Sequence, residues 1–170
     1  MPVASEQRAG RALYTPEQRV RRDASHWTLV QGLLAPLQFM VFLVSLCLVL
    51  RYLVTGAGYE AANVSIIVKT LVLYTIMVTG ALWERDVFGV YLFAPAFFWE
   101  DVVSFVVIGL HTAYLVAILT GRLTPAEQML IALAAYATYV VNAGQFLLKL
   151  RAARLQSAAP RGSDIQELAS

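Results

Sequence analysis

Two adjacent carboxyl side chains, Glu100 and Asp101, directly follow the aromatic run at residues 97–99. Carboxyl groups in such poorly hydrated surroundings are candidate general acids and bases, because neighbouring carboxyls resist double ionisation and one can hold a proton. Glu84 also follows a tryptophan and is the reserve candidate for this chemistry. The alternative interpretation is structural: both carboxylates would stand at a helix N-terminus and interact favourably with its dipole.

His111 is the ionisable side chain expected deepest in the apolar part of the chain. It follows Glu100 by eleven residues, so at ~100° per residue the two lie only about 20° apart on one helix face. Ser104 and Tyr114 lie close to the same line. Comparable polar lines are Thr138, Asn142, Gln145 and Lys149, and Gln31, Gln38, Ser45 and Tyr52. Such groups either hold helices together by hydrogen bonds or line a site. For His111 the alternatives are a core residue, a proton carrier, or an axial ligand to a metal chelated by a tetrapyrrole.

The elements that must position these residues are long apolar helices. Of the 170 residues, 59% are apolar and 14% are charged, against about 25% charged in an average soluble domain. No charge occurs from residue 28 to residue 50, and a helix of that length spans about 34 Å, enough to cross a hydrocarbon core of roughly 30 Å. The sequence therefore predicts an all-α fold, a four-helix transmembrane bundle with spans at residues 28–54, 62–83, 95–119 and 125–150.

Polar segments flank the predicted membrane domain, residues 28–150. Residues 1–27 are expected to form a cytoplasmic arm whose amphipathic helix lies along the membrane surface, and residues 151–170 a disordered cytoplasmic tail. The segment at residues 15–18 has the Thr-Pro-x-Gln pattern of a helix start, and residues 124–127 repeat this chemistry at the fourth span.

The distribution of Lys and Arg predicts how the helices are oriented. Ten of them lie in the two tails and the middle loop, whereas only Arg51 and Arg122 lie in the other two loops. Because Lys and Arg are enriched in cytoplasmic segments, both termini are predicted to be cytoplasmic. Lys69, the one charge inside the second span, is expected to extend outward to the interface. The net charge of +2, without basic residues interleaved with aromatics, argues against nucleic acid as a partner.

Several stretches of the sequence resemble a known family of membrane enzymes. They are LYTPEQR at residues 13–19, WTLVQG at residues 27–32, YLFAPAFFWED at residues 91–101 and LHTAY at residues 110–114. These stretches are similar to the vinyl bacteriochlorophyllide hydratases, and the similarity covers most of residues 13–150.

The resemblance implies a hydro-lyase of bacteriochlorophyll synthesis, a multi-pass protein of the bacterial inner (intracytoplasmic) membrane. Such an enzyme adds water across the 3-vinyl group of chlorophyllide a or bacteriochlorophyllide and gives a 3-(1-hydroxyethyl) group. It needs no cofactor, because hydration is not a redox step. Its expected partners are the pigment, the lipid bilayer, and a second copy or other pigment-synthesis enzymes. The alternative is a non-catalytic pigment carrier or assembly factor that uses the same pocket without an acid.

Vinyl hydration requires a proton on the terminal carbon, followed by attack of water on the cation beside the ring. Glu100 is expected to be the acid and Asp101 to position the water, with exchangeable roles and Glu84 in reserve. Arg85 is expected to pair with the substrate propionate, and His111 to be a magnesium ligand or proton relay; the protein would hold no metal of its own. The remaining predicted substrate-binding residues are Tyr91, Phe93, Phe97, Phe98 and Trp99, which would form an apolar wall, together with Tyr114 and Asn142.

Overall fold

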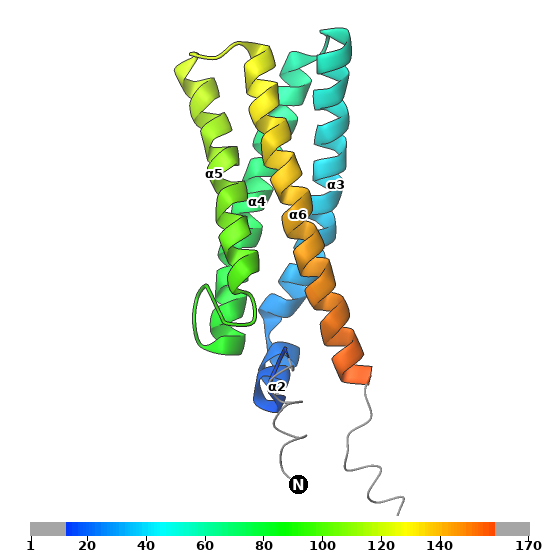
Figure 1. The fold of residues 1–170 in the computed structure, drawn as a ribbon, viewed down its shortest axis with the longest axis vertical. Helices are drawn as coiled ribbons and strands as arrows, with labels where there is room; N and C mark the ends of the chain where they lie inside the picture. Colours follow the sequence, from blue (N-terminus) through cyan, green and yellow to red (C-terminus); the bar gives the residue numbers. More distant parts are fainter. Residues whose placement is uncertain (1–12, 159–170) are drawn as a thin grey trace, which may run out of the picture.

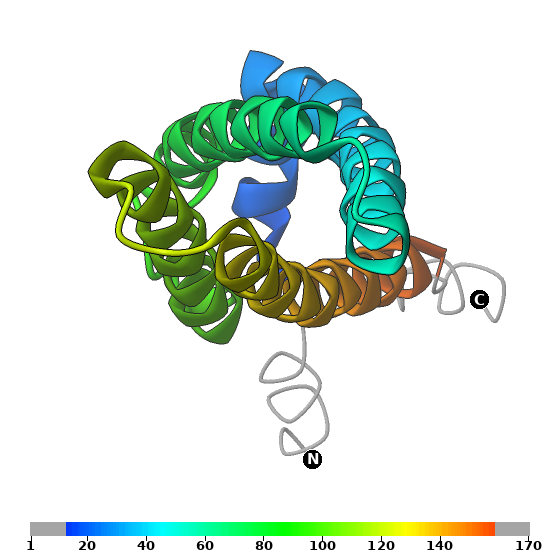
Figure 2. The same cartoon turned by 90° about the horizontal axis from the view of Figure 1, so that it is seen from above.

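The computed structural model describes residues 13–158, which form five α-helices and confirm the predicted all-α fold. The helices are α2 (Pro16–Ala24), α3 (His26–Thr55), α4 (Tyr59–Phe88), α5 (Phe98–Thr120) and α6 (Pro125–Ala158). The four long helices run up and down along the molecule, and α2 lies at one end (Figure 1). Seen from above they form a ring, in which α3 packs beside α4 and α6, and α5 packs beside the same two helices (Figure 2).

All four long helices are long and apolar enough to cross a membrane: His26–Thr55, Tyr59–Phe88, Phe98–Thr120 and Pro125–Leu155. Their outward sides carry large apolar side chains, such as Leu33, which is 74% exposed, and Leu119, which is 84% exposed. A helix satisfies its own backbone hydrogen bonds, so an apolar exterior of this kind suits a lipid environment. The ring therefore has the surface of a multi-pass membrane protein.

Two helices begin with the capping chemistry that the sequence predicts. The Thr15 hydroxyl accepts the Gln18 N–H at 3.2 Å, and the Gln18 side chain accepts the Thr15 N–H at 2.9 Å. Thr124 and Glu127 make the same reciprocal pair at the start of α6, at 3.3 and 2.8 Å. Both caps satisfy N–H groups that have no partner within the helix.

Among the helix ends that differ from the sequence prediction, three lie at the α2 side of the ring. Helix α4 does not end at Trp83 but continues to Phe88 and stops at Gly89 (φ 81°). The charged residues 84–86 do not end the helix, because Glu84 and Val87 are buried on its inner face and only Arg85 and Asp86 are exposed. Helix α5 starts at Phe98 rather than at residue 95, since a turn closed by the Phe97 N–H to Ala94 O bond of 2.8 Å precedes it.

The third difference concerns α6, which continues to Ala158. The predicted unstructured tail is therefore wrong for residues 151–158, where Ala153 is buried among apolar neighbours that hold the last turns. Residues 159–170 of the predicted tail and residues 1–12 of the predicted arm lie outside the described part of the chain.

Polar side chains between the helices act as packing contacts at several levels. The Ser45 hydroxyl bonds to the Ser65 hydroxyl at 2.7 Å and to the Tyr136 hydroxyl, linking three helices. Gln31 donates to the Thr79 hydroxyl at 2.8 Å. These contacts support the packing interpretation for those positions, since interhelical hydrogen bonds contribute ~0.6 kcal/mol each on average.

The helix α2 packs against the end of α4 rather than standing apart from the bundle. Ser25, which follows α2, donates its hydroxyl to Asp86 at 2.8 Å. Tyr14 is buried, stacks on Phe88 with ring centroids 5.8 Å apart, and has the Arg22 guanidinium 5.0 Å from its ring centre. Burial raises the pKa of the Tyr14 hydroxyl above its usual value. We call this region, with the 89–97 loop and the last turns of α6, the α2 end.

Candidate active site at the α2 end

Three carboxyl side chains are buried at the α2 end. Glu84 on α4 is 5% exposed, while Glu100 and Asp101 in the first turn of α5 are 6% and 3% exposed. Because a helix turns ~100° per residue, the two α5 carboxyls face different neighbours: Asp101 faces α4, and Glu100 faces α6. The structure thus brings together the acidic residues singled out in the sequence and divides them into two environments.

Glu84 and Asp101 form a carboxyl pair behind the 89–97 loop. Their side chains are neighbours in the interior of the ring. Each also accepts a backbone N–H from the loop: Phe93 N–H donates to Asp101 Oδ2 at 2.7 Å, and Ala94 N–H donates to Glu84 Oε2 at 3.1 Å. Phe93 has a positive φ of 60°, which is uncommon for a side chain of its size. The pair therefore anchors the loop at two consecutive residues, one of which has this uncommon backbone conformation.

Glu100 has a different partner, the ammonium group of Lys149. The Lys149 Nζ atom lies 3.6 Å from Glu100 Oε2 and donates to the Ala96 carbonyl. Glu100 Oε2 is buried and accepts no hydrogen bond from the described residues. Glu100 Oε2 therefore faces a cation on α6, whereas Asp101 faces a second carboxyl on α4. Lys149 lies on the predicted polar line of α6, but its pairing with Glu100 was not visible in the sequence.

The five aromatic residues predicted as one apolar wall occupy two places. Phe97 is buried and packs on Trp83 with ring centroids 5.4 Å apart. The others are exposed on the outer side of the loop: Tyr91 by 53%, Phe93 by 42%, Phe98 by 44% and Trp99 by 67%. Phe93 stacks on Phe105 of α5 with an interplanar angle of 11°. The exposed set, Tyr91, Phe93, Phe98 and Trp99, is called the outer aromatic face below.

Arg85 lies beside the outer aromatic face. It is exposed, and its guanidinium carbon lies 4.9 Å from the ring centre of Tyr91. A cation at this distance is attracted to the π-face of the ring. These two predicted substrate-binding residues are therefore in contact, and Arg85 follows Glu84 directly in the sequence.

Asn142 and Tyr114 act as hydrogen-bonding residues within the bundle. The Asn142 amide donates to the Glu100 carbonyl at 2.9 Å and to the Ser104 hydroxyl at 3.0 Å, joining α6 to the start of α5. Tyr114 is fully buried and donates to Asn63 Oδ1 at 3.0 Å, near the opposite end of the ring. Asn142 thus lies next to the acidic residues, whereas Tyr114 does not.

His111 lies on the same buried face as Glu100 but about 16 Å further along α5. Its Nδ1 atom lies 2.8 Å from the Val107 carbonyl, and its Nε2 atom lies 3.1 Å from Lys69 Nζ. A carbonyl oxygen can only accept, so Nδ1 carries the hydrogen and Nε2 accepts from Lys69. With both nitrogens engaged, His111 has no lone pair directed at a ligand in this arrangement.

The expectation that Lys69 extends outward is wrong. Lys69 is fully buried, and its Nζ atom lies 4.1 Å from the ring centre of Tyr139 and 5.1 Å from that of Tyr136. The His111 nitrogen and these aromatic faces replace water around the nitrogen atom. The contacts come from α5 and α6 and are therefore long-range, which explains why the sequence of α4 alone did not predict them.

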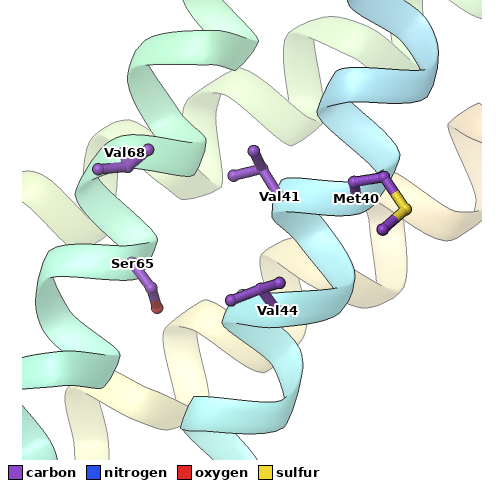
Figure 3. Close-up of a pocket in the computed structure, with 5 residues that line it drawn as sticks. All are labelled: Met40, Val41, Val44, Ser65 and Val68. Carbon is purple, nitrogen blue, oxygen red and sulfur yellow. The ribbon is translucent and has the colours of Figure 1, made fainter.

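A separate apolar groove of about 270 Å³ lies between α3 and α4 (Figure 3). It is lined by Met40, Val41, Val44, Ser65 and Val68. It contains no ionisable side chain and so offers no acid or base. Within the described residues, no group of three or more His, Cys, Asp or Glu side chains is arranged to hold a metal ion.

Fold and site together define a multi-pass membrane protein with a buried carboxyl pair at one end of a helical ring. Comparison with known proteins identifies its family. The sequence profile of the 2-vinyl bacteriochlorophyllide hydratase family matches residues 14–152, and the chain belongs to this family.

Two curated relatives support this assignment. A 2-vinyl bacteriochlorophyllide hydratase of Rhodobacter capsulatus is 68% identical over 158 residues, covering 93% of this chain and 92% of the relative. A protein of the same name from Cereibacter sphaeroides is 72% identical over 145 residues, covering 85% and 90%. No solved structure matches the chain.

Proposed function

We propose that this protein adds water to the vinyl group of a bacteriochlorophyllide, with the Glu84–Asp101 pair as general acid. The names of the relatives supply the substrate class and the reaction. The buried contact between the two carboxyls supports the choice of acid. Two neighbouring buried carboxyls resist double ionisation, so one of them can hold the proton that the reaction needs.

The first chemical step places that proton on the terminal carbon of the vinyl group. Positive charge develops on the carbon attached to the macrocycle, and the carboxylate left behind stabilises it. Water then attacks this carbon, the C–O bond forms, and the water loses a proton to a nearby base. The product carries a 1-hydroxyethyl group. Glu100 serves as the base, because its Oε2 atom is buried beside the Lys149 ammonium and accepts no hydrogen bond from the described residues.

This assignment changes the roles predicted for Glu100 and Asp101. Asp101 moves from positioning the water to donating the proton, because it contacts Glu84 rather than a cation. Glu84 becomes a member of the acid pair instead of a reserve. Glu100 takes the proton from water. We do not assign His111 as a magnesium ligand, because Lys69 occupies its Nε2 atom.

The substrate is proposed to lie on the outer aromatic face. A flat apolar macrocycle matches a surface of exposed rings, and the Arg85 guanidinium at the edge of that surface matches a propionate. Asp101 lies directly behind the backbone of Phe93. A vinyl group at this point reaches the acid pair once the Phe93 N–H to Asp101 bond opens.

The orientation in the membrane follows from the distribution of basic residues. The α2 end, with α2, the end of α4, the 89–97 loop and the end of α6, carries seven of the ten Lys and Arg among the described residues and is therefore proposed to face the cytoplasm. The bacterial inner (intracytoplasmic) membrane is the proposed location, with residues 28–150 as the membrane domain.

The experiment is hydration by membranes that contain the protein. Wild-type membranes supplied with a vinyl bacteriochlorophyllide should yield a product heavier by one water molecule. Glu84→Gln should lower turnover by about 10²–10⁴-fold, the usual contribution of a positioned acid, without loss of pigment binding. Glu60→Gln, at an exposed carboxyl on the first turn of the same helix, is the matched control. Wild-type protein that binds pigment without any mass gain would instead indicate a carrier.

A further inference from the structure

Four buried side-chain atoms have no hydrogen-bond partner among the described residues, and they belong to only three residues. They are both amide atoms of Gln38, Oε1 of Gln145 and Oε2 of Glu100. Gln38 is 2% exposed and Glu100 is 6% exposed. Buried polar groups normally have partners, especially in a membrane protein, where they are expensive to leave unsatisfied. Three such residues in one bundle indicate a site for a polar ligand.

The helix register places these residues in the same part of the ring. The Phe42 ring lies 4.9 Å from that of Tyr139 between antiparallel α3 and α6. Gln38, one turn before Phe42, therefore lies opposite residues 142–143 of α6. Gln145 is within one turn of that level. Glu100 lies at the same level, because Asn142 donates to the Glu100 carbonyl at 2.9 Å.

The three side chains come from three helices, and those of Gln38 and Glu100 lie on the buried faces of α3 and α5. Gln38 shares its buried face with Phe42 and Ser45 on α3, and Glu100 shares its buried face with Ser104 on α5. The α2 end, with the carboxyl pair, is next to Glu100 along the chain. Glu100 therefore connects the level of Gln38 and Gln145 to the carboxyl pair, because it directly precedes Asp101 in the chain.

We propose that Gln38, Gln145 and Glu100 hold the water molecule that is added to the vinyl group. This inference rests on the proposed hydratase function and names the residues that position its second reactant. A buried water requires two to four polar partners. The Gln38 amide offers one donor and one acceptor, and the other two residues offer acceptor oxygens for the hydrogens of water.

The step balances in protons and electrons. The water oxygen provides the electron pair of the new C–O bond to the cationic carbon, and the Glu100 carboxylate takes one hydrogen of the water as a proton. The acid pair has given one proton to the terminal carbon, so the protein ends with the same number of protons as before. Proton exchange between the two carboxyl sites then restores the starting state.

The test is hydration in D₂O by Gln38→Met, which keeps the length of the side chain and removes both polar atoms. Protonation of the vinyl group is followed either by attack of water or by loss of a proton, which returns a deuterated vinyl substrate. If Gln38 positions water, kcat falls about tenfold to hundredfold while KM for the pigment stays unchanged. The ratio of deuterium exchange to hydration rises, because attack of water on the cation becomes slower while loss of a proton from it does not.

Gln31→Met is the matched control, since Gln31 lies two turns earlier on α3 and its amide is bonded to Thr79. It should leave the exchange ratio at the wild-type value. If Gln38→Met does not accumulate in the membrane, Gln145→Met carries the same expectation. An unchanged ratio of deuterium exchange to hydration overturns the water site. If KM for the pigment also rises, Gln38 contacts the pigment instead. Absence of hydration by the wild-type protein would instead refute the underlying function.

Discussion

Replacing Asp101 by Asn separates proton donation from the structural work of this residue. Asp101 Oδ2 accepts the Phe93 N–H at 2.7 Å and also interacts with Glu84. An Asn side chain keeps a carbonyl oxygen for the Phe93 N–H, and its amide can donate to the Glu84 carboxylate. The variant therefore retains both contacts but cannot transfer a proton.

The two effects have different magnitudes. A hydrogen bond contributes about 0.5–1.5 kcal/mol net, so exchanging one acceptor for another should change the free energy of unfolding by less than about 1 kcal/mol. Loss of a positioned general acid lowers the rate by about 10²–10⁴-fold, which corresponds to about 3–5 kcal/mol in activation free energy. Asp101→Ala should lose the same activity and in addition leave the Phe93 N–H unpaired, at a cost of about 1–3 kcal/mol.

The assay compares three proteins in the same membranes: wild type, Asp101→Asn and Asp101→Ala. Product formation is followed by mass, and stability by thermal unfolding in detergent. We expect both variants to be inactive and only Asp101→Ala to be clearly less stable. If Asp101→Asn keeps activity within about threefold of wild type while Asp101→Ala is inactive, the residue only anchors the 89–97 loop, and the acid must be sought elsewhere.

The remaining predictions concern charges inside the ring and one helix cap. Lys149→Met removes the cation 3.6 Å from Glu100 and should lower turnover about tenfold, with recovery in Lys149→Arg; full activity in the Met variant would exclude a role for the Lys149–Glu100 pair in turnover. Lys69→Met should leave thermal stability unchanged or raise it, because a buried charge costs more than an apolar replacement. His111→Ala should lower stability, since it leaves the Lys69 ammonium without its acceptor at 3.1 Å; the reverse order in unfolding midpoints would contradict this account. Thr124→Ala removes the cap of α6 and should reduce the free energy of unfolding by about 1 kcal/mol; an unchanged value would show that packing alone fixes this helix start.

The helices themselves were predictable, because their determinants are local. Four apolar runs of sufficient length and two capping sequences predict where α2 and α6 begin and how many long helices follow. The inward side of α5 was also predictable, since Glu100 and His111 share one face by helical geometry, and both are buried. Local patterns carry this information because period and capping depend on neighbouring residues only.

The environments of the site residues could not be predicted, because they depend on contacts between distant segments. The pairing of Asp101 with Glu84 requires that α4 continue past Trp83 and that the loop return its backbone N–H groups to both carboxyls. The aromatic residues are divided between the interior and the surface: Phe97 is buried, while Phe93, which has a positive φ, is exposed. Neither feature has a signature in the residue types alone.

In the proposed mechanism, one turn of α5 supplies both an acid and a base, Asp101 and Glu100. Equivalent environments would give Glu100 and Asp101 similar proton affinities and no direction for proton transfer. The ~100° step between them instead places Asp101 against a second carboxyl on α4 and Glu100 against an ammonium on α6. A carboxyl neighbour favours the protonated form and a cation favours the ionised form. The direction of proton flow proposed here, from the Glu84–Asp101 pair to the pigment and from water to Glu100, therefore follows from which helix each side chain faces.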